Sequence, residues 1–156
     1  MPQTIPGSKL PTEIPLKNQT NSARIPALCQ HRPFNDRLMI LYFAADLLWA
    51  SRIKATADAL GLPARPVRNL EMLNARFADS APAALVADLD KPDIALALIA
   101  AAANHAPKPR IVAWGPHVEK DTLQRARDAG ADEVLTRGAF DHNLEEILLR
   151  LAASNR

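Results

Sequence analysis

Cysteine and long apolar runs are both scarce in this sequence. Cys29 is the only cysteine, so the chain can form no internal disulfide and offers no paired-thiolate spacing for a metal ion. The longest apolar stretch, residues 94–103, is about half of the roughly 20 residues that a helix needs to cross a bilayer. Prolines and polar residues interrupt the N-terminal region, which predicts no secretory signal. We therefore expect a soluble protein of the reducing cytoplasm with no membrane partner.

Motifs for nucleotide binding and nucleophilic hydrolysis are also missing. The sequence contains no glycine-rich phosphate loop, no G-x-S-x-G elbow and no cysteine and histidine pair, which argues against both chemistries. The formal net charge is +2, and this excess arises before residue 37, where four basic residues face two acidic ones. The remaining chain has no basic footprint, so we expect no nucleic-acid partner.

Length and composition instead predict one globular domain. Apolar residues make up 48% and charged residues 23% of the 156 residues, close to ordinary globular usage. Residues 1–36 contain six prolines and no helical or strand period, which predicts a disordered tail before a domain over residues 37–156. The alternatives for this leader are a partner-binding segment or a true translation start at Met39.

Apolar segments alternate between strand and helix patterns along the domain. Strands are expected over residues 38–43, 64–67, 84–87, 110–114 and 133–135. Helices are expected after Asp46, over residues 70–78, 94–104 and 119–129, and after Asp141. Asp46 and Asp141 are each expected to cap the helix that follows, and Gly61 and Gly130 to end helices. Such alternation predicts a doubly wound α/β fold, with a five-stranded parallel sheet covered on both faces.

Two segments resemble the receiver domains of bacterial response regulators. Asp88 ends a central strand and Pro92 follows four residues later, as in the phosphoacceptor loop of receivers. Residues 130–137, GADEVLTR, resemble the receiver segment that ends in a functional lysine. The resemblance covers roughly residues 38–153 and implies a flavodoxin-like fold with strand order 2-1-3-4-5 and a role in two-component signalling.

The resemblance also identifies positions where this chain departs from a working receiver. Receivers place an acidic pair after the first strand to bind Mg²⁺, and this chain has Ala44 and Ala45 there, followed by Asp46. Cation charge is needed to bring an anionic phosphoryl donor to a carboxylate. Asp88 is the phosphoacceptor equivalent, and Asp46 and Asp90 are the remaining acidic-pocket candidates. Two carboxylates supply too few oxygens for a hard divalent ion, so we expect no metal and no cofactor.

Three further positions lack the usual switching chemistry. Gly115 stands at the hydroxyl position after the fourth strand, and Val134 at the aromatic position on the fifth. Arg137 stands at the lysine position, where a planar guanidinium does not replace a compact ammonium. We expect Arg137 to form an ion pair with Asp88 instead.

These departures predict a pseudo-receiver, which is not an enzyme and acts through protein–protein contacts. The partner is expected to be another signalling protein, bound to the face made by residues 119–129, 133–135 and the last helix. That face would present Glu119, Gln124, Arg125, Asp132 and Arg137. One alternative is an authentic phosphoacceptor receiver that uses Asp88 with Mg²⁺, and another is a small-ligand sensor. The sequence leaves the oligomeric state open.

Overall fold

The computed structural model describes residues 38–154 of the chain. The predicted leader lies outside the described residues, so its disorder, its alternative binding role and the later start stay predictions. The strands are β1 Ile40–Phe43, β2 Ala64–Pro66, β3 Ala84–Asp88, β4 Arg110–Gly115 and β5 Glu133–Thr136. The helices are α2 Leu47–Ala59, α3 Leu70–Asp79, α4 Pro92–Ala103, α5 Lys120–Asp128, α6 Arg137–His142 and α7 Leu144–Ala153.

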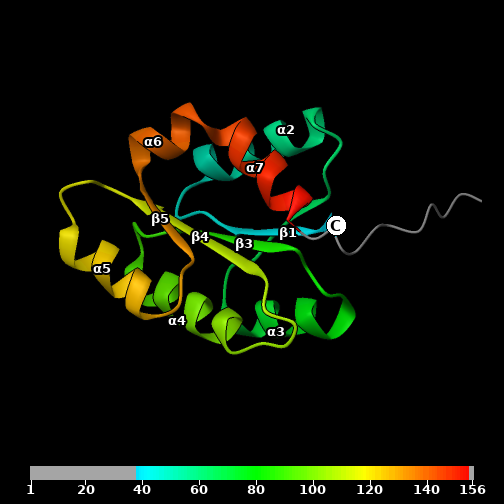
Figure 1. Cartoon of the computed structure of the whole chain (residues 1–156), viewed down its shortest axis with the longest axis horizontal. Helices are drawn as coiled ribbons and strands as arrows, with labels where there is room; N and C mark the ends of the chain where they lie inside the picture. Colours follow the sequence, from blue (N-terminus) through cyan, green and yellow to red (C-terminus); the bar gives the residue numbers. More distant parts are fainter. Residues whose placement is uncertain (1–37, 155–156) are drawn as a thin grey trace, which may run out of the picture. The chain divides into compact units, whose positions relative to one another are not determined.

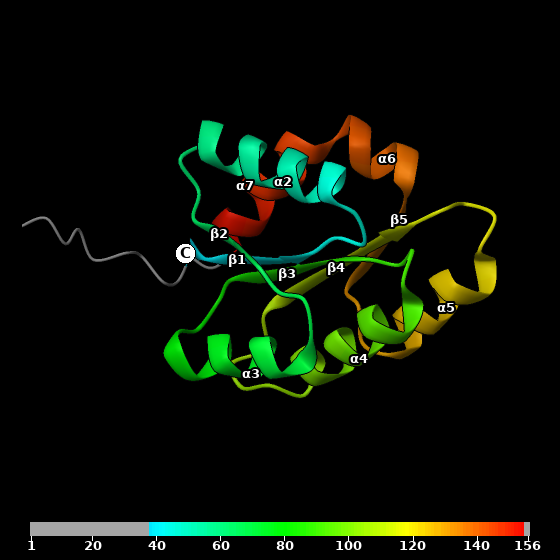
Figure 2. The ribbon, with the colours of Figure 1, turned by 180° about the vertical axis from the view of Figure 1, so that it is seen from behind.

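The strands form a single parallel sheet in the order β2-β1-β3-β4-β5, as predicted. β3 lies at its centre, with Val86 opposite Tyr42 of β1 and Val112 of β4. Helices α2, α6 and α7 lie on one side of this sheet and α3, α4 and α5 on the other (Figure 1). Figure 2 shows the same two layers from behind. The predicted doubly wound fold is confirmed.

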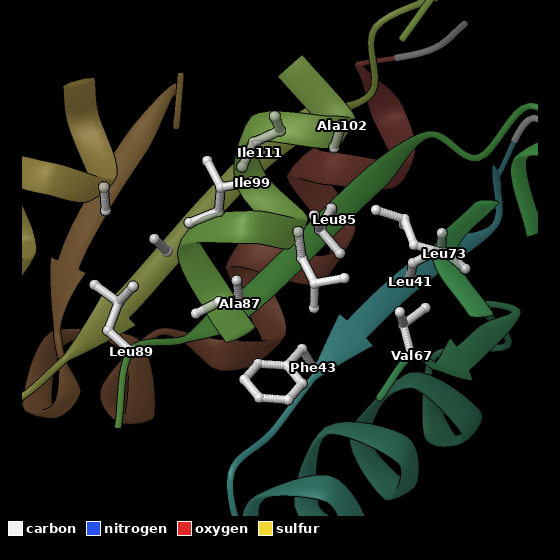
Figure 3. Close-up of a cluster of buried hydrophobic side chains, with 14 of the residues drawn as sticks. Leu41, Phe43, Val67, Leu73, Leu85, Ala87, Leu89, Ile99, Ala102 and Ile111 are labelled. Atoms are coloured by element: carbon white, nitrogen blue, oxygen red, sulfur yellow. The ribbon is translucent and has the colours of Figure 1, made fainter. Parts of the chain in front are cut away.

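Alternate residues of the strands enter two separate hydrophobic cores. Leu41, Phe43, Leu85 and Ala87 face α3, α4 and α5 (Figure 3). Their neighbours, such as Ile40 and Val86, belong to the core under α2, α6 and α7. Burial on both faces explains why these strands are continuous apolar runs instead of alternating apolar and polar residues.

Local signals fix several helix ends. Asp46 caps α2, because its Oδ1 accepts a 2.9 Å hydrogen bond from the amide of Trp49. Gly130 follows α5 with φ of 114°, and a Cβ there would lie 2.5 Å from the Cβ of Ala103. Only glycine meets both the left-handed backbone and this close approach.

The prediction for Asp141 is wrong. Asp141 lies inside α6 and is not the cap of the last helix. Thr136 caps α6 instead, with its Oγ1 accepting from the amide of Ala139 at 3.3 Å, and α7 begins at Leu144 without a side-chain cap. The extra helical turn places Phe140 in the core, and that burial outweighs the low helix propensity of Gly138.

No helix within residues 38–154 has both the length and the apolar character needed to cross a bilayer.

Candidate functional site

The predicted site residues meet at the carboxyl edge of the sheet. Asp88 is the last residue of β3 and Gly115 the last of β4, while Arg137 directly follows β5. Asp46 comes three residues after β1 ends at Phe43. Because the strands are parallel, these ends lie along one edge, where doubly wound folds usually place their sites.

Asp88 is buried, and both of its carboxylate oxygens accept backbone hydrogen bonds. Its Oδ2 accepts from the amide of Ala45 at 2.9 Å and its Oδ1 from the amide of Asp90 at 3.0 Å. The side chain is 0% exposed. Burial raises the pKa of Asp88 above its ordinary value, although the two amide donors oppose this. The carboxylate therefore fastens the turn after β1 to the loop after β3.

The expected ion pair between Asp88 and Arg137 is not formed. Arg137 donates from Nη2 to Oδ2 of Asp90, which is two residues beyond Asp88 and more exposed. The guanidinium also lies 5.7 Å from the ring centre of Trp114, within cation–π range. The physical reason is that Asp88 is buried and its oxygens already accept hydrogen bonds from amides, whereas the side chain of Asp90 is partly exposed in the loop after β3.

Each acidic candidate at this edge therefore has a partner within the described residues. Asp46 caps α2, Asp88 holds two amides and Asp90 pairs with Arg137. Ala44 and Ala45 have no side-chain oxygen to add. No group of three or more His, Cys, Asp or Glu side chains suited to a metal ion occurs among residues 38–154. The residues present do not fit Mg²⁺, which demands near-octahedral oxygen coordination.

Gly115, at the position of the hydroxyl side chain, leaves little room for a larger residue. A Cβ at Gly115 would lie 3.0 Å from the Cβ of Leu89. Leu89 is itself buried and donates its amide to the carbonyl of Trp114 at 2.8 Å. A threonine or serine at this position would therefore require Leu89, the residue that follows Asp88, to shift by a few tenths of an ångström.

No protein-family model matches the chain, and no curated protein matches it. Solved structures do. A response regulator from Thermotoga maritima superposes with a TM-score of 0.62 at 14% identity, covering 74% of this chain and 97% of that one. For the signal receiver domain of a histidine kinase from Syntrophus aciditrophicus the TM-score is 0.64 at 18% identity, covering 74% and 90%.

A third structure is a response regulator from Burkholderia pseudomallei with a phosphorylated aspartic acid and a calcium ion. It superposes with a TM-score of 0.56 at 20% identity, covering 76% of this chain and 75% of that one. The chain has the receiver-domain fold. The likeness establishes this fold and leaves the activity to be argued from the site.

An aromatic cluster lies beneath the carboxyl edge of the sheet, and sequence reasoning missed one of its members, Phe140. The rings of Trp114 and Phe140 stack with centres 4.7 Å apart and planes 2° from parallel. Trp49 packs against Trp114 with ring centres 4.6 Å apart. Val134 at the aromatic position of the receiver is half-buried in the opposite core. The local signal for Phe140 was Thr136, a residue type that often caps helices, directly before residues 137–142, where a loop was expected.

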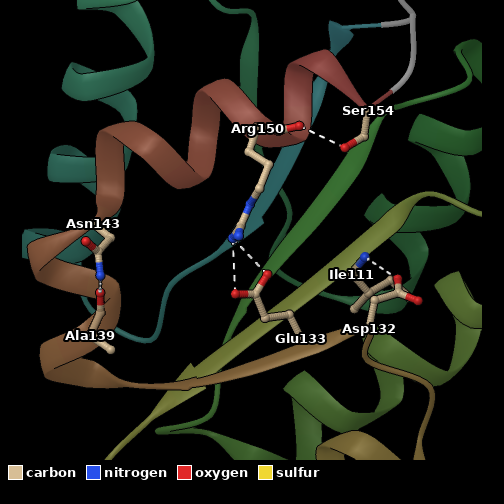
Figure 4. Close-up of polar contacts among 7 residues, drawn as sticks. All are labelled: Ile111, Asp132, Glu133, Ala139, Asn143, Arg150 and Ser154. Carbon is tan, nitrogen blue, oxygen red and sulfur yellow. Dashed lines mark hydrogen bonds and ion pairs between the residues drawn. The ribbon is translucent and has the colours of Figure 1, made fainter.

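The face expected to bind a partner consists of α5, β5 and α7. Glu119, Gln124, Arg125 and Asp132 are exposed there, and Arg137 is partly exposed at its upper end. β5 is an edge strand. Arg150 of α7 binds both oxygens of Glu133 in β5, and Asp132, just before β5, accepts from the amide of Ile111 (Figure 4). Asp132 also forms an ion pair with Lys108.

Proposed function

We propose that this receiver-like domain acts in two-component signalling as an interaction module without Mg²⁺-dependent phosphorylation. Its partner is another signalling protein, and α5, β5 and α7 form the binding face. The domain performs no catalysis of its own under this proposal.

One observation carries the proposal: at the expected metal position, a backbone amide donates a hydrogen bond to the expected phosphoacceptor, Asp88. The amide of Ala45 donates to Oδ2 of Asp88, and the amide of Asp90 takes the other oxygen. Phosphorylation at Asp88 would require its nucleophilic oxygen to give up a hydrogen bond from a backbone amide. It would also require neutralisation of the incoming phosphoryl charge, for which Ala44 and Ala45 provide no metal ligand.

The alternative function, phosphotransfer at Asp88, is favoured by the position of this residue at the end of β3. The Burkholderia pseudomallei response regulator shares the fold and carries a phosphorylated aspartic acid. The retained aspartate alone does not supply the missing metal ligands, so we place this alternative second.

Phosphoryl chemistry can be tested directly on the full chain. We expect incubation with acetyl phosphate and Mg²⁺ to add no phosphoryl group by intact mass spectrometry. We also expect beryllium fluoride with Mg²⁺ to leave the amide NMR shifts of residues 44–46 and 88–90 unchanged. Saturable binding or a mass gain that is absent in Asp88→Asn would establish the phosphotransfer alternative instead.

The binding face requires a separate test in cells. A photo-crosslinking residue at Arg125, on α5, should capture a signalling protein. The same probe at Asn74, exposed on α3, is the matched control and should not capture it. Equal capture at both positions would contradict the assignment of this face.

A further inference from the structure

The carboxyl edge has a hollow directly above the alanine pair. It encloses about 280 Å³ between the start of α2 and the start of α4. Its lining residues are Phe43, Ala44, Ala45, Asp46, Leu47, Ala50, Arg68, Lys91 and Ile94. Phe43, labelled in Figure 3, is the last residue of β1. The hollow thus lies where a working receiver would hold its metal ion.

Apolar side chains at this hollow are unusually exposed. Leu47 is 79% exposed and Ile94 is 37% exposed, and they rise from two different helices. Ala44 and Ala45 form an apolar floor between them in place of carboxylates. An isolated exposed leucine needs no explanation, but two exposed apolar side chains on the walls of one hollow offer a contact surface for an apolar side chain of a partner.

The rim of the hollow is positively charged. Arg68 and Lys91 line it, and neither forms an ion pair with another residue in the described range 38–154. The one acidic lining residue, Asp46, is bonded to the amide of Trp49 as the cap of α2. The lining therefore carries two positive charges and one negative charge, and its net charge is positive.

We propose that this hollow binds an acidic amphipathic segment of a partner protein, with an apolar side chain in the hollow and carboxylates on Arg68 and Lys91. The inference rests on the proposed function as an interaction module and adds a second contact face to it. The volume of about 280 Å³ is below the range of about 300 to 1,000 Å³ typical of small-molecule pockets, so it suits one or two side chains.

The chain offers a matched control for the apolar wall. Leu48 is 75% exposed, nearly as much as Leu47, and follows it in the same helix. Successive helical residues point about 100° apart, and Leu48 does not line the hollow. Leu47→Glu and Leu48→Glu therefore introduce the same charge on equally exposed positions, and only the first enters the proposed binding site.

The test is selection from a displayed library of helical peptides on the full-length protein, followed by affinity measurement of the selected peptides by fluorescence anisotropy. We expect enriched peptides to carry a leucine, isoleucine or phenylalanine with aspartate or glutamate within one helical turn. Leu47→Glu and Ile94→Glu should each raise Kd by about tenfold or more. Leu48→Glu should change it by less than about twofold.

Charge reversal provides the second arm. The double variant Arg68→Glu and Lys91→Glu should raise Kd by about tenfold or more and remove most of its dependence on salt. Lys120→Glu, on α5 and outside the hollow, should leave Kd unchanged. Circular dichroism of each variant checks that it remains folded.

Four outcomes would overturn the inference. Selection could enrich no peptide, enrich peptides without carboxylates, or yield peptides that bind Leu48→Glu as weakly as Leu47→Glu. Light scattering could also show a dimer of the full chain that Leu47→Glu dissociates, which would make a second copy the occupant. Each differs from failure of the proposed function, which the beryllium fluoride and Arg125 experiments report independently.

Discussion

Two aspartates at opposite edges of the same sheet have similar contacts and opposite electrostatics. Asp88 ends β3 at the carboxyl edge, and Asp132 precedes β5 at the amino edge. Each carboxylate accepts a hydrogen bond from the backbone amide of a distant residue, Ala45 for Asp88 and Ile111 for Asp132. The pKa of Asp88 is raised, whereas the pKa of Asp132 is lowered.

The difference lies in burial and in the placement of a cation. Burial alone would raise the pKa of Asp132 too, but its hydrogen bonds from Lys108 and from the amide of Ile111, with the nearby positive charge, lower it. Asp88 is more deeply buried, and the cation at its edge, Arg137, bonds to Asp90 instead. At the amino edge the cation Lys108 therefore contacts the carboxylate of Asp132 directly. At the carboxyl edge the buried carboxylate of Asp88 contacts no cation directly among residues 38–154.

The largest expected effect concerns the close packing of Gly130, which precedes β5 at the amino edge. Gly130→Ala forces a side chain onto a backbone at φ of 114° and against Ala103. We expect the free energy of unfolding to fall by about 2 to 4 kcal/mol, from backbone strain and overpacking together. Urea denaturation at neutral pH measures this change.

Gly138 is the matched control for that substitution. It lies in α6, and a Cβ there would meet no atom within 4 Å. Gly138→Ala should leave stability unchanged or raise it by about 0.5 to 1 kcal/mol, because alanine restricts the unfolded chain and favours helix. A loss for Gly138→Ala as large as that for Gly130→Ala would show that the close approach to Ala103 is not responsible.

The next effect concerns the hydrogen bonds that Asp132 accepts at the amino edge. Asp132→Ala removes the acceptor for the part-buried amide of Ile111 and the partner of Lys108. We expect the free energy of unfolding to fall by about 1 to 3 kcal/mol. Asp128→Ala is the control, since Asp128 is exposed and, among residues 38–154, its side chain accepts only from the Gln124 side chain. Its cost should be under about 0.5 kcal/mol.

The comparison also predicts opposite pH dependence for the two aspartates. The folded pKa of Asp132 lies below its ordinary value of 3.8, so its stabilising contribution is present above that pH and is lost as the pH falls below it. The folded pKa of Asp88 lies above 3.8 because of burial. The folded state then binds the proton more tightly than the unfolded state, and stability is lost as the pH rises above 3.8.

Urea denaturation from acid to neutral pH tests both signs. The stability difference between the natural protein and Asp132→Asn should shrink as the solution is acidified. As the pH rises from about 4, the free energy of unfolding of the natural protein should fall relative to that of Asp88→Asn. Parallel curves for the natural protein and Asp88→Asn would mean that Asp88 is charge-compensated after all.

The sequence predicted the elements that depend on local patterns. The strands were visible as short apolar runs, and the caps of α2 and α5 as Asp46 and Gly130, because these signals act within a few residues. The strand order followed from the likeness of the Asp88 loop and residues 130–137 to receivers.

Contacts between distant segments could not be predicted in the same way. The identity of the partner of Arg137 depends on which of two aspartates, Asp88 or Asp90, reaches the surface, and sequence spacing does not determine depth. The prediction that Asp141 caps the last helix failed because residues 137–142 form a helix that buries Phe140. That burial is a tertiary effect, which local sequence patterns do not reveal. The tight contact that a side chain at Gly115 would make likewise depends on Leu89, which is remote in sequence.

The smallest expected effect is the coupling between Asp90 and Arg137, the ion pair that keeps the cation of the carboxyl edge away from Asp88. The two side chains are 29% and 39% exposed, so solvent screens their attraction. A double-mutant cycle with Asp90→Ala and Arg137→Ala in urea should give a coupling energy of about 0.2 to 1 kcal/mol. Asp88→Ala with Arg137→Ala should give a smaller value, and Asp90→Ala with Arg150→Ala, whose partner is Glu133, should give none. A larger coupling for Asp88 than for Asp90 would mean that Arg137 interacts mainly with the buried carboxylate of Asp88. The two edges of the sheet would then be electrostatically alike.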